Sequence, residues 1–208
     1  MLLAKIKEVF GVDMPLSADE VAKKMSLNAN SVSQMFRRWC EQGKIERWGY
    51  GIYYIPKQSR FFGKKKMSTE KVIQVRYLGS DQSPIGYYSD LTLANVAGIT
   101  TQMAATKTIV TNATASRRRK IKVGDRSVYL KAPRKTITNF NVRAMELLDL
   151  LLIADDYSEY GREETKRLIQ EFAIKNKITA AQVQDVLEFF PSKAAKALMT
   201  MEVYNVFA

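Results

Sequence analysis

Two closely spaced helix-start signals, Ser17 and Asn28, constrain the fold of this chain more than any other sequence feature. Glu20 follows Ser17 at the spacing of a capping box, in which the hydroxyl and the carboxylate each bind a backbone amide at a helix start. Asn28 is a favoured N-cap as well. A helix over about 18–25 must therefore end in a short turn before a second helix begins after Asn28.

The second of these helices is expected over about 29–42. Val32 and Phe36 lie on one apolar stripe at helical spacing, so one face of the helix is predicted to pack against a core. Gly43 supplies the C-terminal stop. An amphipathic helix over 2–10 precedes the pair, which gives three helices in the first part of the chain.

After Gly43 the pattern changes from helix to strand. Residues 44–48 and 52–55 are predicted strands, and the glycine-rich stretch 49–51 joins them in a tight turn before Pro56 ends the second strand. Helix, helix, short turn, helix and hairpin is the order of a winged helix-turn-helix. We therefore expect a winged helix-turn-helix DNA-binding domain over 1–57.

Candidate DNA contacts lie on the polar faces of the helix after Asn28 and on the hairpin. A major groove about 12 Å wide admits one helix, and the amides at a helix N-terminus suit phosphates. Short polar side chains can read base edges, and arginines can bind phosphate or guanine. The alternative is a winged fold that contacts proteins, with solvated arginines. The expected DNA-binding residues are Asn28, Asn30, Ser31, Ser33, Gln34, Arg37, Arg38, Lys44, Arg47 and Tyr50.

The charge of the chain favours a polyanionic partner. Thirty-three basic residues against 21 acidic ones give a formal net charge of +12, whereas residues 146–208 are acidic on balance. The sharpest basic run has no acidic residue from Ser116 to Gly124 and is interpreted as a surface for phosphate or an acidic partner. The alternative is a solvated hairpin. The run consists of Arg117, Arg118, Arg119, Lys120 and Lys122.

Composition excludes several kinds of chemistry. The chain has no histidine and one cysteine, so imidazole catalysis, histidine or cysteine-rich metal sites and an internal disulfide are excluded. The acidic pairs 155–156 and 163–164 could hold magnesium, but both are expected at helix ends, where carboxylates often lie for other reasons. We expect no enzyme activity, no catalytic residue, no metal and no cofactor. A signal peptide and a membrane span are not expected, so the predicted location is the cytoplasm, without membrane contact.

The rest of the chain is predicted to form a linker over 58–67 and a mixed domain over 68–208. A helix is expected to begin at Ser68, a short one to cover 91–97, and a strand to include Tyr129. Asn139 or Asn141 is expected to cap a strongly apolar helix, and three more helices follow. The predicted fold class is α+β: an N-terminal winged helix-turn-helix and a larger α/β domain that ends in helices.

Two stretches resemble the AbiE-type abortive-infection antitoxins of type IV toxin–antitoxin systems. Gly43–Pro56 looks like the wing of that family, with a basic strand followed by "Gly-x-Tyr". Ile85–Gln102 looks like its more distinctive signature of "Tyr-Ser", a helix and "Gly-Leu-Thr-Thr-Gln", with Ile99 in place of the usual leucine. Val110–Asn112 also resembles the following strand of the family. The likeness covers most of 43–112.

The resemblance implies a two-domain antitoxin and transcriptional autorepressor. The winged helix would bind inverted repeats in double-stranded DNA at its own promoter. The second domain would antagonise a cognate nucleotidyltransferase-like toxin without a stable complex, and the Arg117–Lys122 run is the nearest match to the basic surface that the family uses. The expected oligomeric state is a monomer or weak dimer. Two other readings remain open: a regulator whose second domain senses a ligand or dimerises, and an enzyme with a DNA-targeting module.

Overall fold

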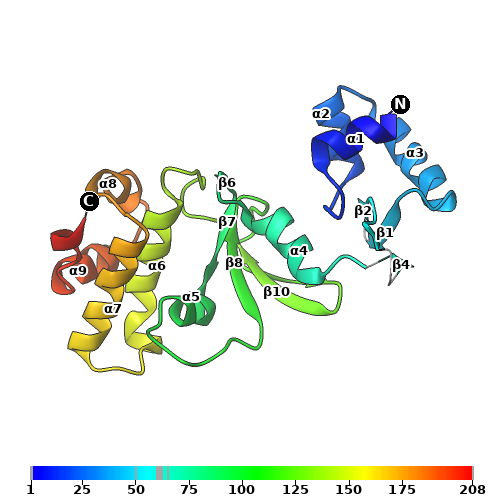
Figure 1. Cartoon of the computed structure of the whole chain (residues 1–208). Coiled ribbons are helices and arrows are strands. Elements are labelled where there is room, and N and C mark those ends of the chain that lie inside the picture. Colours follow the sequence, from blue (N-terminus) through cyan, green and yellow to red (C-terminus); the bar gives the residue numbers. More distant parts are fainter. Residues whose placement is uncertain (1, 50, 60–62, 65, 208) are drawn as a thin grey trace. The chain divides into compact units, whose positions relative to one another are not determined.

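The computed structural model describes residues 2–49, 51–59, 63–64 and 66–207. The chain divides into two compact units, Met1–Arg76 and Tyr77–Ala208 (Figure 1). The second domain was expected to start at residue 68, which lies inside the first of these units.

The first unit has the predicted order of helices and strands. Two helices are followed by a turn, a third helix and an antiparallel hairpin, and an isolated bridge between Leu16 and Tyr53 adds a third short segment to the hairpin. This is the winged helix-turn-helix topology. The elements are α1 (Leu2–Phe10), α2 (Ala18–Met25), α3 (Ala29–Glu41), β1 (Glu46–Gly49) and β2 (Ile52–Tyr54).

The predicted helix starts are confirmed at the level of hydrogen bonds. The Glu20 amide donates to the Ser17 hydroxyl at 3.3 Å, and the Ser17 amide donates to the Glu20 carboxylate at 3.0 Å, which completes the capping box. Ser26 takes a left-handed conformation (φ 54°) and ends α2. The turn between α2 and α3 is therefore fixed at both sides by local sequence signals.

The core of the first unit contains the predicted apolar stripe of α3. Val32 and Phe36 are each 1% exposed and pack with Ile6 from α1 and Val21 from α2. Trp39, on the same stripe, is only partly buried at the edge of this core. Burial of this stripe decides which side of α3 faces outward.

The stretch expected as a linker, 58–67, holds a short hairpin of β3 (Gln58–Ser59) and β4 (Gly63–Lys64). The indole N–H of Trp48 donates to the Met67 carbonyl oxygen at 3.0 Å, so the end of this stretch is attached to the wing. Ser68 caps the next helix as predicted. The elements that follow are α4 (Thr69–Ile73) and a π-helical turn, η1 (Gln74–Leu78).

Helix α4 also belongs to the first unit. The Lys71 ammonium of α4 lies 3.0 Å from the carboxylate of Asp13, a residue of the segment between α1 and α2. Helix α4, which the sequence analysis placed at the start of the second domain, thus forms an ion pair with the first unit.

The second unit is built on a four-stranded sheet in the order β7-β8-β10-β9 (Figure 1). Strand β8 pairs antiparallel with β7 and parallel with β10, and β10 pairs antiparallel with β9, so β9 is an edge strand. A small hairpin of β5 and β6 precedes the sheet. The strands are β5 (Gly79–Ser80), β6 (Ser83–Pro84), β7 (Gly86–Ser89), β8 (Lys107–Thr111), β9 (Arg119–Val123) and β10 (Arg126–Lys131).

Helices pack against one half of this sheet and continue into a C-terminal helical layer. The apolar helix predicted after Asn139 or Asn141 forms, and most of its residues from Val142 to Leu151 are buried, but Asn141 does not cap it with its side chain. That side chain accepts the Thr138 amide at 2.9 Å instead. The fold class is α+β, as predicted. The helices are α5 (Asp90–Val96), α6 (Val142–Tyr157), α7 (Arg162–Lys175), α8 (Ala180–Leu187), α9 (Ser192–Thr200) and a 3-10 turn, η2 (Val203–Val206).

Among the described segments of the chain, no helix combines the length and the apolar character that crossing a bilayer requires.

The close backbone packing around Gly86 in the second unit can be tested by a substitution. A Cβ at this position would lie 2.0 Å from the Tyr77 carbonyl oxygen and 2.7 Å from that of Val110, so Gly86→Ala forces backbone apart. We expect a loss of at least about 1–3 kcal/mol of unfolding free energy, the usual cost of overpacking. Urea denaturation followed by far-UV circular dichroism measures it. The control is Gly161→Ala, where a Cβ meets nothing within 4 Å; an equal loss in the two variants would contradict the close approach.

Candidate nucleic-acid interface

The N-terminus of α3 is capped by Asn28, as predicted. Its side-chain oxygen accepts the amides of Asn30 at 2.9 Å and Ser31 at 3.2 Å. These two amides are therefore not available to a phosphate, contrary to the expectation that the start of the helix offers free amides. Asn28 therefore has a structural role as the cap of α3, and any contribution of its own to DNA contact must come from its exposed side-chain amide group.

The polar face of α3 is exposed throughout. Every predicted contact residue on the helix is solvent-exposed, while Val32 and Phe36 on the opposite side are buried. Residues three or four apart on a helix lie on the same side. Gln34 therefore forms a continuous row with Arg37 and Arg38, which follow it by three and four residues. The exposed predicted residues are Asn30, Ser31, Ser33, Gln34, Arg37 and Arg38.

Arg37 and Arg38 have no ion-pair partner within the part of the chain that the structure describes. Two guanidinium groups that are exposed and uncompensated create a positive potential at the C-terminal half of α3. Guanidinium donors match phosphate oxygens and the edge of guanine in geometry. The polar residues of α3 nearer Asn28 are uncharged, whereas the C-terminal half of the helix carries Arg37 and Arg38 together with Glu41.

The wing is held against α3 by aromatic contacts. The Tyr53 ring meets the Phe36 ring edge-on, with centroids 5.1 Å apart, and Arg47 lies opposite Tyr53 in the strand pair. The Tyr54 hydroxyl donates to the Glu46 carboxylate, and burial, followed by that hydrogen bond, raises the pKa of Tyr54 to about 12. Arg47 is exposed on β1. Tyr50, the predicted contact at the tip, lies outside the described residues.

Lys44 lies away from the row on α3. It lines a groove of about 500 Å³ together with Lys7 from α1 and Lys57 after β2. Apolar residues, among them Leu3 and Ile55, also line this groove. Lys44 is therefore grouped with two lysines that the sequence reading did not select, because their convergence depends on the tertiary fold.

The basic run of the second unit lies on an exposed strand and the turn before it. Arg119, Lys120 and Lys122 belong to β9, and Arg117 and Arg118 precede it. All five side chains are exposed. A hairpin with β10 was one of the two expectations for this run, and the antiparallel pairing of β9 with β10 confirms the hairpin without deciding its role.

Sequence reasoning missed a buried polar network at the end of β7. The Tyr87 hydroxyl donates to the Asp149 carboxylate at 2.9 Å, and the Ser89 hydroxyl donates to it at 3.4 Å. Desolvation raises the pKa of Asp149 and the pKa of Tyr87. Asp90 follows in a left-handed conformation (φ 54°) and pairs with Lys131 at 3.3 Å. Only the fold brings these side chains together, since they come from β7, β10 and α6.

The most distinctive sequence motif has a structural explanation. The Glu159 carboxylate accepts the hydroxyl of Thr100 at 2.9 Å and both the amide and the hydroxyl of Thr101 at 2.8 Å. The Glu159 amide in turn donates to the Ile99 carbonyl oxygen at 3.0 Å. These hydrogen bonds, first among them that from the Thr101 amide, lower the pKa of Glu159. The threonines of the motif thus tie the loop after α5 to the loop after α6.

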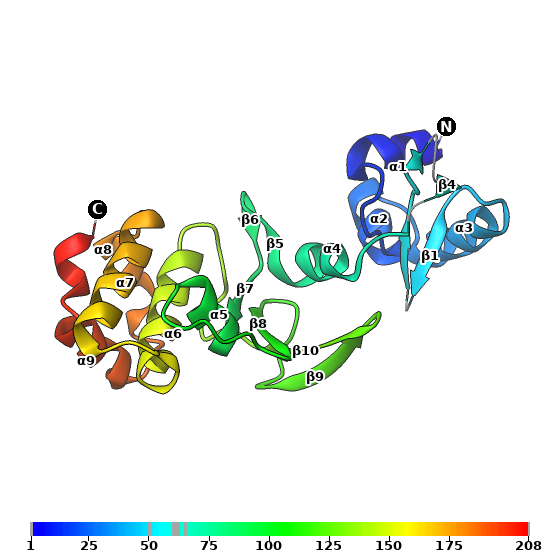
Figure 2. The same ribbon diagram turned by 60° about the horizontal axis from the view of Figure 1, so that its bottom comes forward.

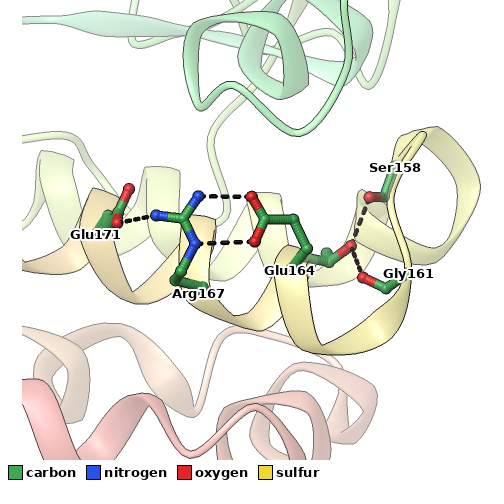
Figure 3. Close-up of polar contacts among 6 residues, drawn as sticks. Ser158, Gly161, Glu164, Arg167 and Glu171 are labelled. Carbon is green, nitrogen blue, oxygen red and sulfur yellow. Dashed lines mark hydrogen bonds and ion pairs between the residues drawn. The ribbon is translucent and has the colours of Figure 1, made fainter.

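One carboxylate of each acidic pair considered as a metal ligand forms an ion pair with a basic side chain. Arg167 donates to both carboxylate oxygens of Glu164, at 2.9 and 2.5 Å, and also to Glu171 (Figure 3). Hydrogen bonding by Arg167 lowers the pKa of Glu164. Asp155 lies 3.5 Å from the Lys193 ammonium. Over the described ranges, no group of three potential metal-ligating side chains comes together.

Comparison with known families places residues 16–188 in a family of unknown function, DUF6088. Because the match spans most of the chain, this protein belongs to that family. No curated protein matches the chain. The matched residues cover most of the first unit and the second unit as far as residue 188.

Asn28 offers a way to separate the stability of α3 from the DNA contact expected of this helix. Asn28→Ala should cost about 0.5–2 kcal/mol of unfolding free energy through loss of the cap, whereas Asn28→Asp should retain stability because aspartate caps equally well. Fluorescence of Trp39 and Trp48, both in the first unit, reports the urea transition. The added negative charge of Asn28→Asp should nevertheless weaken binding to duplex DNA. Unchanged stability of Asn28→Ala would contradict the capping role.

Proposed function

We propose that this DUF6088 protein is a DNA-binding transcriptional autorepressor and the antitoxin of a type IV toxin–antitoxin system. The first unit would bind an inverted-repeat operator in double-stranded DNA through α3 and the wing. The second unit would antagonise a nucleotidyltransferase-like toxin without forming a stable complex with it. The protein would act as a monomer or a weak dimer.

One observation carries the DNA-binding part of this proposal: the outward face of α3 is polar and cationic, while its inward face is locked in the core. Asn30, Gln34 and Arg37 are exposed, and Phe36 is 1% exposed behind them. A helix held from behind can enter the major groove without unfolding. A face used for packing against another part of the same chain would instead be apolar and covered.

The charge distribution supports the same reading. The arginines of α3 and Arg47 on β1 are exposed, and Arg37 and Arg38 have no ion-pair partner among the described residues. Protein cations without acidic partners gain the most from neutralising phosphates, because they release condensed counterions and lose no internal ion pair. Binding should accordingly weaken steeply as salt is added.

The antitoxin part of the proposal rests on the resemblance of Ile85–Gln102 to the AbiE-type antitoxins and on the exposed basic run. Arg117–Lys122 supplies a cationic surface in a unit that also contains the matched motif. The motif itself is structural here, because Thr100 and Thr101 hold Glu159. The basic run is therefore the better candidate for antagonising a toxin.

A second candidate function is a winged-helix regulator whose second unit senses a small ligand. A pocket of about 350 Å³ between α5, α6 and α7 favours it. The buried Glu146 carboxylate pairs there with Arg143 at 2.7 Å, and burial raises its pKa despite that arginine. Apolar residues such as Val96 and Phe172 also line the pocket. A ligand that alters operator affinity would favour this alternative.

Arg38→Ala tests the recognition helix. We expect weaker binding to the duplex upstream of the gene by about 1–3 kcal/mol if Arg38 contacts a base, or a salt slope reduced by about one if it contacts a phosphate. A mobility-shift titration at several salt concentrations measures both. Lys196→Ala is the control because it removes the same charge from an exposed position on α9. Unchanged affinity and slope for Arg38→Ala would remove this residue from the interface.

Neutralising the basic run tests the antitoxin role. With Arg117, Arg118, Arg119 and Lys120 all changed to glutamine, we expect operator binding to be retained, because these residues lie outside the winged helix. Rescue of growth from a co-expressed nucleotidyltransferase-like toxin should be lost. The control is Arg38→Ala, which should rescue growth while repressing poorly. Growth rescue equal to that of the unmodified protein would refute a role for the run in antagonising the toxin.

A further inference from the structure

The register of the β9–β10 pair divides the basic run between two faces of the sheet. Lys120 lies opposite Tyr129, and Lys122 lies opposite Ser127. Directly opposed residues in an antiparallel pair share a face, and successive residues of a strand alternate. Lys120 and Lys122 therefore lie on the Tyr129 face, whereas Arg119 points to the other side. The residues of the basic run are therefore alike in charge but lie on two different faces of the sheet.

Two cations of the run lie over the Tyr129 ring. The guanidinium carbon of Arg118 is 4.3 Å from the ring centroid, and the Lys120 ammonium nitrogen is 5.9 Å from it. Both distances are within the range of a cation–π interaction. An aromatic ring, a planar guanidinium group and an ammonium group thus form one cluster on this face. This cluster, together with Lys122 on the same face, is called the Tyr129 platform.

This half of the sheet face is open. Helices α5 and α6 pack against β7 and β8, where Tyr87 and Val110 are buried on the same face as Tyr129. In Figure 2, β9 and β10 extend beyond these helices. Tyr129 remains half-buried, and Lys120 and Lys122 are exposed. The Tyr129 platform is therefore accessible to a partner without any rearrangement of the second unit.

The cations of the platform are uncompensated. Within the described parts of the chain, Arg118, Lys120 and Lys122 have no carboxylate partner. Lys131, the next basic residue on this face, pairs with Asp90 at 3.3 Å and is therefore already neutralised. Charged residues on an edge strand can also serve to prevent pairing with other sheets. That role needs neither a shared face nor an aromatic ring, and Arg119 would fill it equally well.

We propose that the Tyr129 platform binds single-stranded nucleic acid. Lys120 and Lys122 would bind successive phosphates, and a base would stack on Tyr129 or on the guanidinium plane of Arg118. Aromatic rings and arginines that lie among backbone-tracking cations are the means by which unpaired bases are recognised. A base within a duplex is already stacked on its neighbours and cannot use such a platform. This surface is separate from the winged helix, so the inference goes beyond the proposed function and stands if operator binding fails.

The adjacent arginines supply a matched pair of variants. Arg118→Gln and Arg119→Gln each remove one positive charge at neighbouring positions, but only Arg118 belongs to the platform. Fluorescence anisotropy of the full chain measures affinity for labelled oligo(U) RNA and oligo(dT) DNA of about 16 nucleotides. We expect Arg118→Gln and Tyr129→Leu to weaken binding about tenfold, as loss of stacking on a single base does. Arg119→Gln should change affinity less than about twofold.

Further arms of the experiment separate this inference from the proposed function. Arg38→Ala should leave single-strand binding unchanged while it weakens binding to the upstream duplex. Preference for RNA over DNA would assign a contact to the 2′-hydroxyl. Equal losses for Arg118→Gln and Arg119→Gln, or competition by duplex as strong as by single strands, would overturn the platform. Circular dichroism melting shows whether the Tyr129→Leu variant remains folded. If that variant is unfolded, the affinity of Arg118→Gln for single strands decides whether the platform binds them.

Discussion

The contact of Phe36 with Tyr53 fixes the relation between α3 and the wing, and the rest of the first unit depends on it. The two rings meet edge-on with centroids 5.1 Å apart, and Phe36 is buried between the helices and the hairpin. An aromatic pair of this kind adds about 0.5–1.5 kcal/mol to the stabilisation from burial. Because this face of α3 is held in the core, its polar face must be presented to solvent, where it forms a rigid surface with β1.

The two units offer nucleic acid different kinds of surface. In the first unit, a helix carries short polar side chains followed by Arg37 and Arg38, an arrangement suited to a groove. In the second, a flat strand pair carries Tyr129 under Arg118, an arrangement suited to unpaired bases. Acidic residues of the C-terminal helices, such as Glu164, form ion pairs with neighbouring cations of the same helices.

Local signals were sufficient to predict the helices α1 to α3 and the hairpin of the first unit. The side chains of Ser17 and Asn28 act on amides two or three residues away, so their capping roles could be predicted from sequence. The grouping of Lys44 with Lys7, the attachment of Lys71 to Asp13 and the network of Asp149 could not be predicted, because each joins residues distant in sequence. The Tyr129 platform could not be predicted without knowledge of the strand register, since a shift of one residue would place Arg119 on that face instead.

The central claim, that the outward face of α3 contacts DNA, can be measured by protection of a single thiol. Cys40 is the only cysteine, so Gln34→Cys in a Cys40→Ser background carries one reactive group on that face. Its rate of maleimide labelling should fall when the upstream duplex is added, while the rate for Glu8→Cys, exposed on α1, should not change. Labelling at position 34 that proceeds equally fast with and without a duplex that the protein has bound would contradict the account.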